Sequence, residues 1–169
     1  MAELSIAIAD DNRQTLNLLG EILEKEDGIH VVGKADNGED AYQMIMDKKP
    51  DIVLLDVIMP KLDGITVLEK IRAANSGKDM PAVIMVTAAG NETVASAAFR
   101  NGASYYILKP FDREVLLDKI RLVAQERLRT KMVSVVREKP ADTYMNKGDY
   151  IHQNLEDDVT QLLHEIGIP

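Results

Sequence analysis

The chain has 169 residues, of which 46% are hydrophobic and 28% charged, and its formal net charge is −8. These values fit one globular domain with a tail, and the negative charge argues against direct nucleic-acid binding. Because there is no cysteine, disulfides and thiolate metal sites are excluded. No signal peptide begins the sequence and no apolar run approaches the ~20 residues that span a membrane, so we expect a cytoplasmic location without membrane partners.

Short apolar runs alternate with helical patterns along the first 130 residues. Strands are predicted at 4–9, 30–35, 51–56, 81–88 and 104–108, and they are followed by helices at 10–28, 38–49, 63–74, 91–102 and 112–129. Five β-α units with near-continuous apolar strands predict a doubly wound α/β fold, in which helices cover both faces of a five-stranded parallel sheet. The first, third and fourth strands have the longest apolar runs and should be central.

Polar residues follow four of these strands. The apolar run IVLLDVIMP contains one carboxylate, Asp56, at the carboxyl end of the third strand. The first strand ends at Asp10 and Asp11, the fourth at Thr87 and the fifth at Lys109. Functional sites of doubly wound folds lie outside the carboxyl ends of the strands, so we expect these five side chains to converge.

The expected cluster has the chemistry of phosphoryl transfer. Three adjacent carboxylates repel one another unless a cation lies between them, and their oxygens suit Mg²⁺ or Ca²⁺. Lys109 and Thr87 would stabilise a phosphoryl group, and Asp56 would be the nucleophile that forms an acyl phosphate. Taken singly, an Asp pair, a strand-end Asp or a Lys-Pro turn is usually structural; their combination at four strand ends favours a site.

The motifs ADDN, LLDVIMPKLDG, MVTA and YYILKPF resemble those of the receiver domains of bacterial two-component response regulators, and the resemblance covers residues 4–128. It implies a flavodoxin-like fold with strand order 2-1-3-4-5. It also implies that Asp56 is the phosphorylated residue. A metal ion would be held by Asp11, Asp56 and the backbone carbonyl of Ile58, with Asp10 in an outer position.

The same resemblance assigns switch roles around Asp56. Thr87 would be the switch hydroxyl, Lys109 the phosphate-pairing lysine and Tyr106 the aromatic switch residue, and the Lys109–Pro110 peptide bond would be cis. The protein would then be a phospho-acceptor switch with intrinsic autophosphatase activity rather than a metabolic enzyme. Its phosphodonor would be a phosphohistidine phosphotransferase or a histidine kinase.

A narrower resemblance is to the sporulation regulators of endospore-forming Firmicutes, on the motifs IADDN, DVIMPKLDGITVLEKIR, GASYYILKPFD and HEIGIP. It implies a receiver domain at 1–130, a linker at 131–153 that partly extends the last helix, and at 154–169 the first helix of a missing DNA-binding effector domain. DNA would be bound only through that effector, which would control transcription at the onset of sporulation.

The tail continues the apolar pattern of the last receiver helix, through Leu128, Met132, Val135 and Val136. Such a stripe favours self-association, and we expect phosphorylation to promote a dimer through the fourth helix, fifth strand and fifth helix. An amphipathic helix is predicted at 154–166.

Other function classes are less consistent with the sequence. An aspartyl-phosphate phosphatase would need a second carboxylate two residues after Asp56, where Ile58 stands. A flavin carrier would need a glycine-rich loop after the first strand, where the sequence is DDNRQ. A response regulator unrelated to sporulation, and an unphosphorylated receiver-like interaction scaffold, remain as alternatives.

Overall fold

The computed structural model describes residues 3–75 and 80–136, and side chains as far as residue 129. The strands are β1 (Leu4–Ala9), β2 (Ile29–Ala35), β3 (Ile52–Leu55), β4 (Ala82–Thr87) and β5 (Ala103–Leu108), and the helices are α1 (Arg13–Glu24), α2 (Gly38–Lys48), α3 (Gly64–Asn75), α4 (Glu92–Arg100) and α5 (Arg113–Val136). The helix expected at 154–166 and the linker residues from 137 onward lie outside the described part.

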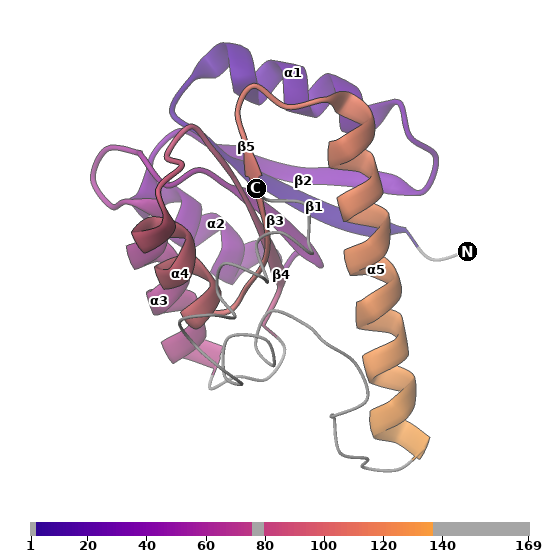
Figure 1. Ribbon diagram of the computed structural model, residues 1–169. Coiled ribbons are helices and arrows are strands. Elements are labelled where there is room, and N and C mark those ends of the chain that lie inside the picture. Colours follow the sequence, from indigo (N-terminus) through magenta and orange to yellow (C-terminus); the bar gives the residue numbers. More distant parts are fainter. Residues whose placement is uncertain (1–2, 76–79, 137–169) are drawn as a thin grey trace.

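The five strands form one parallel sheet in the order β2-β1-β3-β4-β5. The predicted fold class is therefore confirmed, as is the central position of β1, β3 and β4. Helices α1 and α5 cover one face of the sheet and α2, α3 and α4 cover the other (Figure 1). Within the described residues, no helix is both long and apolar enough to cross a membrane.

Each face of the sheet has its own apolar core. Alternate residues of a strand point to opposite faces, so Ile84 packs toward α1 and α5 while Met85 packs toward α2, α3 and α4. Both side chains are fully buried. The helices contribute residues at the predicted helical spacing: Leu16, Leu19, Ile22 and Leu23 of α1 and Leu116, Ile120 and Val123 of α5 are all buried. Met44 of α2 and Ile65 of α3 pack against the second core but are only half-buried.

The helices on the second face are anchored unequally. In α3, Val67, Leu68 and Ile71 are fully buried. In the shorter α4, the buried residues are Ala95, Ala98 and Phe99. Asparagine side chains accept hydrogen bonds from backbone N–H groups at the starts of three helices, with Asn12 before α1, Asn37 before α2 and Asn91 before α4.

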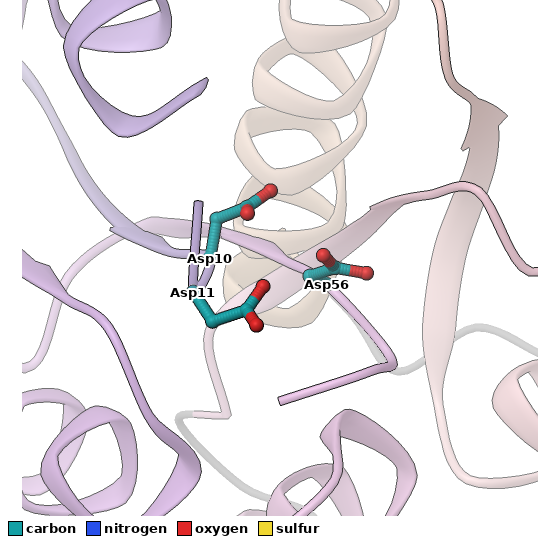
Figure 2. Close-up of side chains that lie close together, drawn as sticks. All are labelled: Asp10, Asp11 and Asp56. Carbon is teal, nitrogen blue, oxygen red and sulfur yellow. The ribbon is translucent and has the colours of Figure 1, made fainter. Parts of the chain in front are cut away.

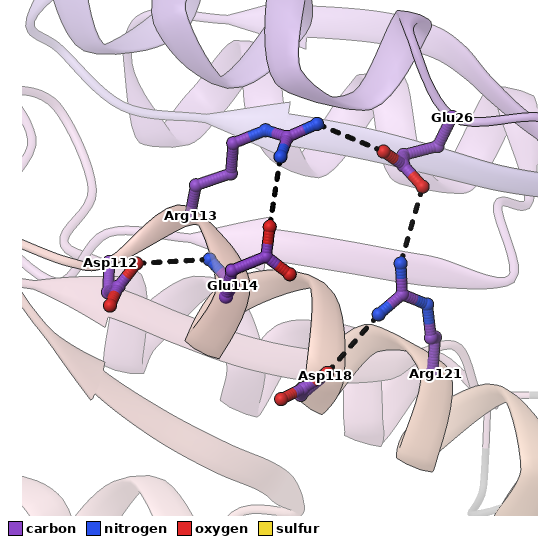
Figure 3. Close-up of polar contacts among 6 residues, drawn as sticks. All are labelled: Glu26, Asp112, Arg113, Glu114, Asp118 and Arg121. Carbon is purple, nitrogen blue, oxygen red and sulfur yellow. Dashed lines mark hydrogen bonds and ion pairs between the residues drawn. The ribbon is translucent and has the colours of Figure 1, made fainter.

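A charged network ties the end of α1 to α5 (Figure 3). The two oxygens of Glu26 accept hydrogen bonds from Arg113 (3.2 Å) and Arg121 (3.3 Å). Each arginine also pairs with an acidic neighbour on α5, namely Glu114 and Asp118. One carboxylate thus bridges two turns of the helix.

We expect Glu26→Gln to lower the free energy of unfolding by about 0.5–1 kcal/mol, because the arginines are half-exposed and water screens their pairs. Urea unfolding at low and at 1 M salt measures this. Salt should shrink the difference between the two proteins. A difference that persists unchanged in high salt would mean that packing rather than charge holds α1 to α5.

Candidate functional site

The carboxyl ends of β1 and β3 bring three carboxylates together (Figure 2). Asp10 and Asp11 follow β1 and Asp56 follows β3, and one oxygen from each lies within 4.8 Å of the others. The strand register explains this arrangement, because Ala9 pairs with Leu55 and the N–H of Asp56 donates to the carbonyl of Ala9. Asp10 and Asp56 are buried, whereas Asp11 is exposed.

Lys109 places an ammonium group against two of the carboxylates. Its Nζ lies 2.6 Å from Oδ2 of Asp10 and 3.1 Å from Oδ2 of Asp56. The position of Lys109 is fixed by its own N–H, which donates to the carbonyl of Thr87 at 2.9 Å. The Lys109–Pro110 peptide bond is cis. The structure therefore joins the ends of β1, β3, β4 and β5 in one site.

Thr87 and Tyr106 lie on the α4 side of this site. Thr87 is fully buried at the end of β4, and its Oγ1 accepts a hydrogen bond from the N–H of Ala89 at 3.2 Å. Tyr106 points inward, is only 4% exposed and donates its hydroxyl to the carbonyl of Ala89. Its ring packs against Phe99 of α4 with centroids 6.4 Å apart. Thr87 and Tyr106 therefore both contact the backbone of the turn that leads to α4.

Burial and the neighbouring charges have opposite effects on the pKa values of Asp10 and Lys109. Burial raises the pKa of Asp10 above its ordinary value, and the bond to Lys109 only partly opposes this. Burial lowers the pKa of Lys109, but its bonds to Asp10 and Asp56 outweigh that effect and the net pKa is raised. Burial, followed by the charge of Asp56, raises the pKa of Tyr106 to about 12. Lys109 and Tyr106 therefore keep their protons at neutral pH.

We expect Asp10→Asn to stabilise the metal-free protein at pH 7, because the variant removes a buried carboxylate whose charged form burial disfavours. The raised pKa of Asp10 means that its charged form is less stable in the folded chain than in the unfolded one. As the pH falls through the folded pKa, native Asp10 takes up a proton and the folded wild type gains stability. The advantage of the variant should therefore shrink at acidic pH.

Urea unfolding with a chelator at pH 7 and pH 4 measures this difference. Asp47→Asn on the exposed side of α2 is the control for the change in net charge. An advantage that grows toward acidic pH would contradict the assignment.

The donor set fits a hard divalent cation. One ammonium offsets only one of three carboxylate charges, so the site stays negative. The carboxylate of Asp11 has no hydrogen-bond partner among the described residues. The carbonyl of Ile58, two residues after Asp56, likewise accepts no hydrogen bond from them. Oxygen ligands of this kind suit Mg²⁺, which keeps several waters and uses few carboxylates.

One close approach beside Asp56 was not anticipated from the sequence. A Cβ placed on Gly64, the first residue of α3, would lie 2.0 Å from the carbonyl oxygen of Asp56. The N–H of Gly64 donates to the carbonyl of Val57 at 2.7 Å. Only glycine lets α3 begin against the peptide of the candidate nucleophile. The signal in the sequence was the Asp63–Gly64 pair, which also suits an ordinary helix start.

The solved structures that this chain resembles are response regulators and their receiver domains. A chain of the CheX-CheY-BeF3-Mg²⁺ complex from Borrelia burgdorferi is 32% identical, with a TM-score of 0.67 over 72% of this chain and 90% of that one. A LuxR-family DNA-binding response regulator from Staphylococcus aureus is 28% identical, with a TM-score of 0.66 over 71% and 98%. The receiver domain of a NarL regulator from Mycobacterium tuberculosis is 26% identical, with a TM-score of 0.64 over 72% and 98%.

The sequence itself also matches a family. Residues 6–121, most of the chain, match the response regulator receiver domain. This range begins inside β1, holds the other four strands and ends inside α5. It also holds every member of the cluster at the strand ends, from Asp10 to Lys109. The chain therefore belongs to the response regulator receiver domain family of two-component systems.

Proposed function

We propose that Asp56 accepts a phosphoryl group from a phosphohistidine side chain of a histidine kinase or phosphotransferase. The observation that carries this proposal is the position of Lys109, whose ammonium contacts both Asp10 and Asp56 at the strand ends. In the transfer, the phosphorus–nitrogen bond of the donor breaks as an Asp56 oxygen bonds to phosphorus. The freed imidazole leaves with the bonding electron pair and takes up a proton from water.

The residues around Asp56 would stabilise the phosphoryl group in transfer and hold the metal ion. Lys109 offsets negative charge on the phosphoryl oxygens, and Thr87 offers its hydroxyl at the neighbouring strand end. Asp11, Asp56 and the Ile58 carbonyl would hold a Mg²⁺ ion, with Asp10 in an outer position, and Ca²⁺ is the alternative ion. When bound, the metal supplies positive charge to the oxygens in transfer. Water later hydrolyses the acyl phosphate, so the chain acts as a switch with autophosphatase activity rather than as a metabolic enzyme.

The output of the switch would pass through α4, β5 and α5. Tyr106 and Thr87 both contact the turn at Ala89. A shift of Thr87 toward a phosphoryl group would therefore move this turn and change the positions of Tyr106 and α4. Exposed apolar side chains on β5 and α5 support a dimer interface on this face, namely Leu108, Val115 and Leu122. The phosphorylated form would pair through this face.

The finer assignment is to a transcription factor of sporulation. The motifs of this chain resemble those of stage-zero sporulation protein A, in which a receiver domain precedes a DNA-binding effector. One structural relative is itself named a DNA-binding response regulator. A regulator of another process is the alternative within the same family. An unphosphorylated scaffold is the alternative outside it, although Asp10, Asp11, Asp56, Thr87 and Lys109 are all present.

Intact-protein mass spectrometry after incubation with acetyl phosphate and Mg²⁺ tests the proposal. We expect the mass of one phosphoryl group to be added, and we expect a chelator to prevent the addition. The added group should be lost in mild base, as an acyl phosphate is, whereas phosphoserine and phosphothreonine would survive. An unchanged mass, or a base-stable adduct, would favour the scaffold.

A further inference from the structure

The loop that follows Asp56 contains a strained turn. Lys61 has a positive φ of 73°, and the N–H of Leu62 donates to the carbonyl of Pro60 at 2.8 Å. A hydrogen bond between residues two apart, around a residue of positive φ, defines the rare form of the γ-turn. A conformation of this kind persists only where its surroundings hold it in place. The contacts that hold this turn therefore also help to fix the position of Ile58, which lies two residues before Pro60 in the same loop.

The first residue of α2 holds the turn. The N–H of Gly38 donates to the same Pro60 carbonyl at 3.1 Å. A Cβ placed on Gly38 would lie 2.0 Å from the carbonyl oxygen of Leu62 and 2.5 Å from its Cβ. These neighbours belong to the loop itself and cannot rotate away as the end of a long side chain could. Gly38 therefore touches the turn at both Pro60 and Leu62.

The start of α2 is itself fixed. Asn37 is buried, and its Oδ1 accepts a hydrogen bond from the N–H of Asp40 at 2.9 Å. Its Nδ2 donates to the carboxylates of Asp36 and Asp40, both at 3.0 Å. Every polar atom of the Asn37 side chain is thus bonded, and the residue next to Gly38 has little freedom to move.

We propose that Gly38 is a positioning residue for the metal site, because its close packing keeps the Pro60–Leu62 turn in place and with it the carbonyl of Ile58. Gly38 would not itself be a metal ligand, because it acts through its contacts with Pro60 and Leu62. The inference rests on the proposed function, in which that carbonyl is a metal ligand. A side chain at position 38 must displace the backbone of Leu62, and the displacement is passed along the loop to Ile58.

The test is calorimetric titration of the whole chain with Mg²⁺. Gly38→Ala should weaken Mg²⁺ binding about tenfold, as changes at residues that support metal ligands commonly do. The matched control is Gly33→Ala in β2. Its Cβ would lie 2.8 Å from the sulfur of Met44 and would meet only that flexible side chain, which belongs to α2, the helix that Gly38 begins. The control should keep the native affinity. Thermal unfolding of both variants separates stability from binding, since a merely structural role would lower the melting temperature without changing the Mg²⁺ affinity.

A second measurement uses the unaltered protein and decides the matter if Gly38→Ala does not fold. If the Gly38–Pro60 hydrogen bond favours Mg²⁺ binding, then Mg²⁺ binding must favour that hydrogen bond to the same extent. Mg²⁺ should therefore slow hydrogen exchange of the Gly38 amide, which donates this bond. If the native chain does not bind Mg²⁺, the proposed function and this inference both fail. If it binds Mg²⁺ but Gly38→Ala binds equally well, or the Gly38 amide exchanges at an unchanged rate, only this inference fails.

Discussion

Asp56→Asn should abolish phosphorylation by acetyl phosphate and Mg²⁺, lowering the rate of incorporation by at least about 10³-fold. Losses of this size follow the removal of a nucleophile in other covalent mechanisms. The variant keeps the shape of the side chain and removes the oxygen anion that attacks phosphorus.

The measurement is the intact mass over time, and the matched control is Asp63→Asn. Asp63 lies in the same loop, is exposed and accepts a hydrogen bond from the N–H of Thr66 at 2.8 Å, which an asparagine can also accept. The control should be phosphorylated at the native rate. Stoichiometric phosphorylation of Asp56→Asn would assign the chemistry to another residue.

Lys109→Met should change metal binding and phosphoryl transfer in opposite directions. The ammonium lies 2.6 Å and 3.1 Å from two carboxylate oxygens and would compete with a bound metal ion for their charge. Without it, Mg²⁺ should bind about tenfold more tightly, which corresponds to about 1.4 kcal/mol. Phosphorylation at saturating Mg²⁺ should nevertheless slow by about 10²–10³-fold, because the charge proposed to stabilise the transition state would be lost.

Calorimetry gives the affinity and the mass assay gives the rate. Lys48→Met, on the exposed end of α2, controls for the loss of one positive charge and should change neither. A parallel fall in affinity and rate would mean that Lys109 mainly holds the site together rather than acting on the phosphoryl group.

The sequence was most informative where local pattern and burial agree. The apolar runs before Asp56 and Thr87 are fully buried strands, and their length and order were enough to predict the sheet and its central strands. The convergence of Asp10, Asp56 and Lys109 could also be predicted, since parallel strands bring their carboxyl ends to one edge. These features depend only on periodicity and on the topology of the fold.

Features that depend on packing between distant segments could not be predicted. Gly38 lies at the start of α2, whereas Leu62 lies in the loop between β3 and α3, so their contact joins segments that are distant in the sequence. A glycine at the start of a helix also has several ordinary explanations. The pairing of Glu26 with both Arg113 and Arg121 requires α1 and α5 to lie side by side, which no local pattern specifies. The inward direction of Tyr106 is set by Phe99 and the Ala89 carbonyl rather than by its position on β5.

The sparse anchoring of α4 has a consequence for local unfolding. Two of its three buried residues are alanines, whereas α3 buries Val67, Leu68 and Ile71. The cost of detaching a helix grows with the apolar area that it exposes, at roughly 0.8 kcal/mol for each buried methylene. We therefore expect opening of α4 to cost less than opening of α3, and α4 to be detached from the sheet more often. A stimulus at Asp56 then has to supply only a small free-energy difference to change how often this helix is attached.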